Sequence, residues 1–419
     1  MAPGITKLHN VNAWLTSCPK LVYRDSWAQK RIASPRIRTA AASSTGSEVA
    51  EGFEEGQLER PKWTGETPLS RLVAALISFK PLYSVLKYGA RQVIISTAEK
   101  SNIPWRDMTQ EILESDVYRE KDFIEDHSVV YPDLSVRITE GRSLSNADYL
   151  NPFHAYDEGN LSWLAAAEAE AATMSIAKRA IPNASSIEEA NQILRGNWLQ
   201  EIENHHKKYS NSTISDILDI GCSVGVSTRY LSDKFTSAQV TGLDLSPYFV
   251  AVAQYKDKLR NQGKNSIRWI HGNGESTGLP SQSFDLVSIS YVFSHGHNPP
   301  TRYCTMSRSL ISPRQKPDQN REGSQFHECP ERAIRNIIKE AFRLLRPGGT
   351  FALTDNSPKS KILQELPPVL FTLMKSTEPF LDEYYLTDID AALKQVGFVN
   401  VHSVLTDPRH VTVTATVPY

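Results

Sequence analysis

The sequence predicts an α/β fold: a mostly parallel sheet of seven strands, with an antiparallel last strand and helices on both faces. From residue 217 onward, short apolar runs alternate with longer segments of helical periodicity. The first run leads into Gly221 and Gly225, and the second ends in Asp244, 25 residues after Asp219. Only residues 406–410 separate the last two runs, which favours an antiparallel pair.

The elements of this domain, expected over residues 211–419, follow in order along the chain. The apolar runs predict strands at 217–220, 239–244, 267–272, 284–291, 350–355, 398–403 and 411–417. The intervening segments predict helices at 225–235, 248–262, 330–345 and 386–396. Residues 343–351 contain Pro347, Gly348 and Gly349, which end a helix and permit the reversal into the fifth strand.

Residues 68–210 are expected to form a helical accessory region that covers the substrate side. Helical periodicity runs from 160 to 179 and from 187 to 208, and Ser185 and Ser186 favour a cap before the second helix. The segment 68–100 is apolar and basic. It predicts either a helix packed on the catalytic domain or one lying on a thylakoid or envelope membrane surface.

The first strand and turn, residues 217–225, are typical of a nucleoside-binding crevice. Gly221 and Gly225 permit a close approach of backbone to a ligand, and Asp244 occupies the place of an acid that binds a ribose diol. A dinucleotide turn needs G-x-G-x-x-G, but the position two after Gly221 is Ser223, and no third glycine opens the helix. The pattern is Asp-x-Gly-x-x-x-Gly.

This pattern resembles motif I of the class I S-adenosylmethionine (SAM) dependent methyltransferases, whose Rossmann-like fold has a reversed final strand. The resemblance covers about half the chain. It implies SAM as the cofactor and a small-molecule acceptor. The resemblance also implies a set of cofactor-binding residues: Asp219, Gly221, Cys222, Ser223 and Gly225 near the methionine moiety, Asp244 near the ribose, Asn273 and Gly274 near adenine, and Leu245 next to Asp244.

Residues 271–285 are similar to the G-D-A-E…L-P…S-F-D stretch of the ubiquinone and menaquinone biosynthesis type of methyltransferase. In that family the acid accepts a hydrogen bond from the adenine amine. Here Asn273 replaces it, so the contact would lack charge assistance. The alternative is that Asn273 favours the turn between Gly272 and Gly274.

A base is needed only if the acceptor loses a proton. His327 follows the fourth strand, at the edge where ligands bind in open α/β sheets, and it titrates near neutrality. We expect it to act as a general base or to orient the acceptor. The alternative is a residue that caps the following helix.

Residues 294–326 are rich in Ser, Pro, Arg and Gln and lack periodicity. If they are removed, Phe293 joins His327 in a short strand-to-helix connection. The hypothesis is a translated intron or misplaced exon boundary, and the alternative is a disordered regulatory loop. Transcript sequencing across the junction would decide between them.

The first 46 residues carry seven Lys or Arg and a single acid, Asp25, which predicts an organelle transit peptide. Chloroplast is favoured over mitochondrion because the resemblance is strongest to plant proteins. The alternative is a disordered N-terminus. Residues 47–67 are polar and acidic and are expected to be a linker.

The formal net charge is -1 and the isoelectric point is near 6.8, which leaves no electrostatic footprint for nucleic acid. The four cysteines lack metal-ligand spacing, and no metal site is expected. The function expected is therefore plastid methyl transfer from SAM to a small, lipophilic acceptor. The alternatives are an NAD(P)-dependent oxidoreductase and a non-catalytic SAM-binding protein associated with a membrane.

Overall fold

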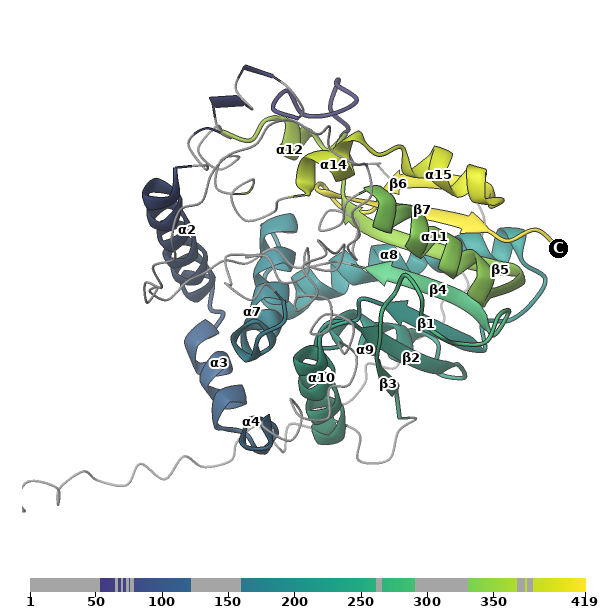
Figure 1. Cartoon of the computed structure of the whole chain (residues 1–419), viewed down its shortest axis with the longest axis horizontal. Coiled ribbons are helices and arrows are strands. Elements are labelled where there is room, and N and C mark those ends of the chain that lie inside the picture. Colours follow the sequence, from purple (N-terminus) through teal and green to yellow (C-terminus); the bar gives the residue numbers. More distant parts are fainter. Residues whose placement is uncertain are drawn as a thin grey trace, which may run out of the picture. The chain divides into compact units, whose positions relative to one another are not determined.

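The computed structural model describes residues 53–64, 79–121, 160–260, 266–290, 331–367 and 380–419, with single positions 67, 68, 71, 72, 75 and 374. Its sheet has seven strands in the order β3-β2-β1-β4-β5-β7-β6 (Figure 1). The strands are β1 Asp216–Ile220, β2 Gln239–Asp244, β3 Arg268–His271, β4 Phe284–Ser290, β5 Leu345–Asn356, β6 Val399–Leu405 and β7 His410–Thr416.

Only the last strand of this sheet is reversed. The β1–β2, β1–β4, β2–β3 and β4–β5 pairs are parallel, whereas β7 pairs antiparallel with both β5 and β6. The predicted fold class is confirmed. All strands except β7 therefore present their carboxyl ends at one edge of the sheet, where ligands bind in open α/β folds.

Helices cover both faces of the sheet. Those described are α2 Lys80–Lys100, α3 Trp105–Glu114, α4 Asp116–Arg119, α7 Trp163–Ala180, α8 Ile187–Tyr209, α9 Val226–Lys234, α10 Pro247–Arg260, α11 Glu331–Leu344, α12 Lys361–Gln364, α14 Leu381–Leu386 and α15 Ile389–Val396. None of them is both long and apolar enough to span a bilayer.

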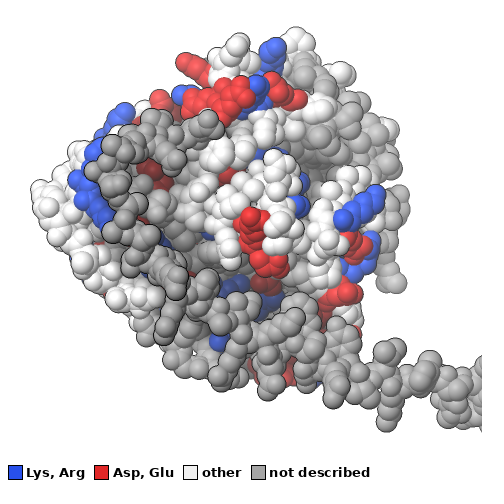
Figure 2. Space-filling view, turned by 180° about the vertical axis from the view of Figure 1, so that it is seen from behind, with Lys and Arg blue, Asp and Glu red and all other residues white. Residues whose placement is uncertain are grey.

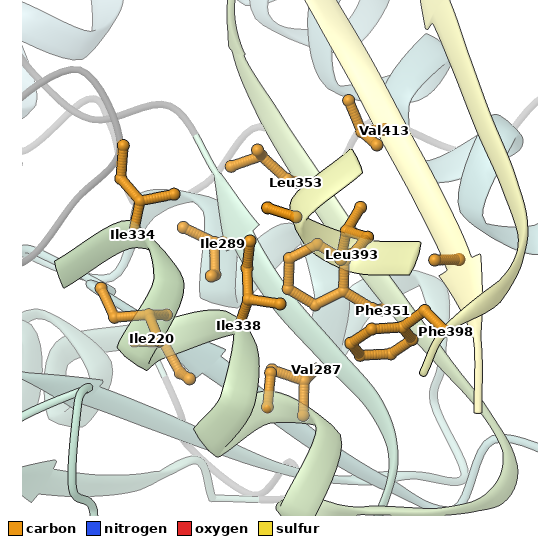
Figure 3. Close-up of a cluster of buried hydrophobic side chains, with 14 of the residues drawn as sticks. Ile220, Val287, Ile289, Ile334, Ile338, Phe351, Leu353, Leu393, Phe398 and Val413 are labelled. Atoms are coloured by element: carbon orange, nitrogen blue, oxygen red, sulfur yellow. The ribbon is translucent and has the colours of Figure 1, made fainter. Parts of the chain in front are cut away.

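One core lies between the sheet and α11 and α15. Figure 3 shows Ile334 and Ile338 of α11 and Leu393 of α15 directed toward Phe351 and Leu353 of β5. All five side chains are buried. A second core on the opposite face packs α8 against the sheet, with the side chains Leu194, Trp198, Ile202, Ile217, Leu286 and Ala352. Side chains that alternate along the same strands thus contribute to two separate apolar layers, one on each face of the sheet.

Helix α8 therefore forms a layer of the sheet domain, although its residues were expected in the accessory region. Residues 52–419 constitute a single compact unit, so the boundary expected at residue 210 does not separate two cores. The expected cap of this helix is present. Ser186 accepts a hydrogen bond from the backbone N–H of Glu189, whose carboxylate accepts one from the N–H of Ser185 at 2.6 Å.

The largest differences from the expected boundaries occur at three places. β5 begins at Leu345 rather than at residue 350, because the turn at Gly348, with φ +77°, is an irregularity within the strand. Instead of one helix at 386–396, α14 ends at Leu386 and α15 begins after Asp388, whose side chain accepts from the N–H of Ala391. Within 68–100, the continuous helix begins at Lys80.

The described part of the expected linker packs on the sheet domain. The N–H of Gly56 donates to the carbonyl of Lys359 at 2.6 Å, and Glu55 forms a bridge with Ser360. Trp63 is 3% exposed and belongs to the same core as the α11 side chains. The polar composition of 47–67 gave no indication that Trp63 would be buried in this core.

Candidate cofactor site

The turn between β1 and α9 is wound in left-handed conformations. Gly221, Ser223 and Gly225 have φ values of 71°, 50° and 80°. The N–H groups of Gly221 and Cys222 both donate to the carbonyl of Leu243, at 2.8 and 3.1 Å. A left-handed conformation is inexpensive for glycine but costs a side-chain-bearing residue such as Ser223 roughly 1 kcal/mol or more. The loop is thus held in place by the neighbouring strand.

Asp244, at the end of β2, ties two loops together. Its Oδ2 accepts from the N–H of Ser223 at 2.7 Å, and its Oδ1 accepts from the N–H of Ser246 at 2.8 Å. The residue is 4% exposed. A carboxylate offers about four acceptor positions, and these bonds use one on each oxygen. Asp244 therefore organises the glycine loop in addition to the ribose contact predicted for it.

Ser223 carries the unsatisfied polar atom of this site. Its Oγ is buried, and within the described ranges no hydrogen-bond partner approaches it. An unpaired buried hydroxyl costs about 1–3 kcal/mol, which a polar ligand at the loop would recover. The carboxylate and ammonium groups in the amino-acid portion of SAM are hydrogen-bond partners of the kind that this hydroxyl lacks.

Asp219, near the end of β1, and Cys222, within the loop, have little exposure to solvent. Asp219 is 1% exposed and accepts from the Thr228 hydroxyl of α9 at 2.7 Å. Burial raises its pKa to about 7, against the opposing effect of this hydrogen bond. Burial also raises the pKa of the Cys222 thiol well above its usual value, so the thiol stays protonated.

The residues expected near adenine form the turn after β3. The Asn273 side-chain oxygen accepts from the N–H of Glu275 at 2.8 Å, which is the turn alternative stated for this residue. Nε2 of His271 donates a hydrogen bond to the carbonyl of Leu245 at 2.9 Å. A β-carbon on Gly274 would lie 2.6 Å from Cγ2 of Ile220, so glycine there permits contact with the end of β1. Adenine contact by Asn273 stays a prediction.

Sequence reasoning missed Trp269 and Arg229. A β-carbon on Gly225 would lie 2.2 Å from Cη2 of Trp269, so the space beside this glycine is filled by an indole ring rather than left for a ligand. Arg229 of α9 donates to the carbonyl of Val224 at 3.0 Å. The glycines at 225 and 242, together with a tryptophan on the next strand, were the signal that could have revealed this packing.

Accessory helix α7 covers the loop. Val224 belongs to one apolar cluster with Ala165 and Ala169 of α7 and with Phe249 of α10. The Ser246 hydroxyl donates to the carbonyl of Asn160 at 2.9 Å, just before α7 begins. Helix α7 and its preceding residues thus lie against both loops that Asp244 joins.

Helix α2 contacts this covering layer. Its Arg91 forms an ion pair with Glu168 of α7, which is 2% exposed. Ile95 and Ala98 are buried in a cluster with Trp105 of α3. These contacts favour the packed alternative for the carboxyl-terminal half of α2.

His327 and the segment 294–326 lie outside the described residues. Over the described ranges, no group of three or more His, Cys, Asp or Glu side chains could hold a metal ion. On the face shown in Figure 2, neither sign of charge alone covers the described surface.

Comparison with known proteins connects this geometry to a family. Residues 218–312 match the family model described as "Methyltransferase domain". A demethylmenaquinone methyltransferase of Lactococcus lactis is 27% identical over 181 residues, which are 43% of this chain and 56% of the relative. A mitochondrial ubiquinone biosynthesis O-methyltransferase of Schizosaccharomyces pombe is 34% identical over 83 residues, 20% of this chain and 29% of the relative.

The chain spans 56 to 66% of the length of the first curated relatives it matches. Among solved structures, human N-acetylserotonin methyltransferase in complex with SAM is similar, with 14% identity, coverage of 74% of this chain and 70% of that one, and a TM-score of 0.38. The family match, the named relatives and the strand order of the sheet together support a class I methyltransferase domain in the carboxyl-terminal half of this chain.

Proposed function

We propose that this chain transfers the methyl group of SAM to a small, lipophilic acceptor. The observation that carries the proposal is the glycine loop with the buried, unpartnered hydroxyl of Ser223 beside Asp244. The loop follows the carboxyl end of β1, and the family match begins within that strand, at residue 218. The relatives named for quinone biosynthesis support a lipophilic acceptor.

The chain's own groups would act by binding and alignment. Bound SAM supplies an electrophilic methyl group on a sulfonium. Ser223 and the loop around it would hold the amino-acid end, and Asp244 would hold the ribose. Methyl transfer is an in-line displacement, so orientation and exclusion of water contribute most of the acceleration. Helix α7, packed on the loop, would exclude water from this side.

Replacing Ser223 by Ala tests the observation directly. The change removes one hydroxyl and keeps the left-handed backbone, so we expect SAM affinity to fall about tenfold or more while the melting temperature stays unchanged or rises slightly. Isothermal titration with SAM and with S-adenosylhomocysteine measures the affinity. The matched control is Ser283→Ala, whose hydroxyl donates to Pro280 at the amino edge of the sheet and should leave affinity unchanged.

The alternative activities are distinguished in the same assay. Titration of the unaltered protein with NADPH should produce no heat of binding, and saturable NADPH binding without SAM binding would favour the oxidoreductase. Transfer of a labelled methyl group from SAM into a lipid extract separates an enzyme from a SAM-binding protein that lacks activity. Unaltered protein that failed to bind SAM would overturn the proposal.

We also propose a plastid location, supported by the basic, acid-poor composition of residues 1–46. A fluorescent fusion of residues 1–52 tests it, and a signal outside plastids would contradict it.

Contact with an anionic membrane surface is a further proposal. It is supported by Leu72 and Phe79, which are 58% and 62% exposed in the basic segment before and at the start of α2. Co-sedimentation with vesicles rich in anionic lipid measures that contact.

A further inference from the structure

The indole of Trp269 fills the space left by two glycines of the cofactor region. On Gly225 a β-carbon would lie 2.2 Å from Cη2 of this ring, and on Gly242 it would lie 2.7 Å from Cε3 and Cζ3. Gly242 is the direct strand partner of Trp269 across β2 and β3. The ring therefore lies against one glycine of the sheet and one of the cofactor loop.

The backbone at Gly242 does not require glycine. Its φ is outside the left-handed range in which Gly221 and Gly225 lie. A side chain is excluded there because its β-carbon would clash with the Trp269 ring and would lie 3.1 Å from Sγ of Cys222. Glycine at this position is thus explained by the ring that it accommodates.

The ring and an arginine hold the end of the loop between them. Arg229 donates to the carbonyl of Val224 at 3.0 Å, and its Nη1 would be 3.2 Å from a β-carbon on Gly225. The indole N–H of Trp269 donates to Asp257 of α10 at 3.4 Å, which fixes the ring from its far end. Residues 224 and 225 are therefore supported by two large side chains from different elements.

We propose that Trp269 is a positioning residue for SAM binding, because it holds the loop of residues 221–225 in its left-handed conformation. This inference rests on the proposed function. Within this loop, the left-handed conformation of Ser223 stores strain that its surroundings must offset. Without the ring the loop would relax, and ligand binding would have to restore the ordered conformation, which lowers affinity.

The test combines changes at Trp269 and Gly242 in the full chain, with SAM and S-adenosylhomocysteine as probes in isothermal titration. We expect Trp269→Ala to weaken both affinities about tenfold. Trp269→Phe, which keeps a ring but reaches less far toward Gly225, should lose less. Gly242→Ala should weaken binding when Trp269 is present. In the double variant the alanine has room, so its combined loss should be at least about threefold smaller than the product of the single losses.

A role in stability alone is excluded by comparing affinity with melting temperature. Trp198→Phe changes another buried tryptophan, in the α8 core, and should lower the melting temperature while leaving SAM affinity unchanged. Trp269→Phe should change SAM affinity beyond what Trp198→Phe does. If the unaltered protein binds SAM and both Trp269 variants bind it equally well, the inference is wrong and the proposed function survives. If the unaltered protein does not bind SAM, both fail.

Discussion

At the scale of single residues, the site combines a strained loop with a carboxylic acid kept away from water. Asp219 is shielded by β1, β4 and α9, and it has the Thr228 hydroxyl as its near partner. Its raised pKa means that it is partly protonated near neutral pH, whereas an aspartate in the unfolded chain is ionised. Asp219 therefore lowers stability at neutral pH.

The replacement Asp219→Asn tests this reasoning through its pH dependence. Between about pH 4 and pH 7 the folded state binds the proton and the unfolded state does not, so stability falls as pH rises through this window and is constant above it. We expect the melting temperature of the Asn variant, relative to the unaltered protein, to rise from pH 5 to pH 8. Asp233→Asn, at a half-exposed surface position, is the control. A difference independent of pH would contradict the assignment.

At the scale of elements, His205 of α8 forms hydrogen bonds that connect this helix to the amino edge of the sheet. Nδ1 and Nε2 of His205 bond to the hydroxyls of Thr414 and Thr416 on β7, at 2.8 and 2.9 Å. Burial, with a smaller effect of the nearby His402, His206 and Lys208, lowers its pKa to about 4. This end of α8 lies opposite the cofactor loop, so it contributes to stability rather than to the chemistry.

We expect His205→Gln to reduce the loss of folding stability as the pH falls. The unfolded chain takes up a proton at His205 near pH 6.5, but the folded chain does so only near pH 4. Stability is therefore lost as pH falls through this window. The Gln variant should be less stable at pH 7.5, by about 1 kcal/mol, yet lose less stability between pH 6.5 and 4. Urea unfolding at several pH values measures this. Tyr209→Phe keeps the histidine and should keep the steeper dependence.

At the scale of the whole molecule, the two ends of the compact unit meet in one core. Trp63, near the start of the described chain, packs against Tyr385 of α14 with ring centroids 5.6 Å apart. The Lys361 ammonium of α12 is ion-paired with Glu54. Residues 53–64 therefore belong to the fold of the sheet domain, although helices α2 to α8 separate the two in sequence.

Replacing Trp63 by Ala should lower the free energy of unfolding by about 3–5 kcal/mol, because it leaves a cavity in a closed core. Deletion of residues 1–66 should destabilise the protein by at least as much. Deletion of residues 1–51, which precede the compact unit, should leave the melting temperature unchanged. Chemical unfolding of the three variants provides the comparison. Equal stability of the two deletions would show that Trp63 contributes nothing.

The sequence predicted what depends on local pattern. Strand and helix alternation indicated the sheet, and the short connection at 406–410 indicated the reversal of β7, which is confirmed. The positions of Gly221 and Asp244, after two neighbouring strands, predicted that their loops lie together. The structure joins these loops through the hydrogen bond from the N–H of Ser223 to Asp244. These features follow from neighbours in sequence or from the general rule that ligands bind at the carboxyl edge.

What the sequence could not predict depends on distant contacts. The burial of Trp63 and the position of the Trp269 ring arise from partners far along the chain or on the next strand, and no local periodicity marks them. Helix α3 was missed as well, although Trp105 and Ile112 on it are buried. Asn273 was predicted with two alternatives, and only the fold revealed its bond within the turn.

The contact between residues 53–64 and the carboxyl-terminal part of the chain has a consequence for biosynthesis. The N–H of Leu58 donates to the side chain of Gln364, 306 residues further on. At ribosomal rates of about 5–20 residues per second, a nascent chain would wait roughly 15–60 s before these partners emerge. The core that contains Trp63 is therefore completed only after the carboxyl-terminal part of the chain has been made.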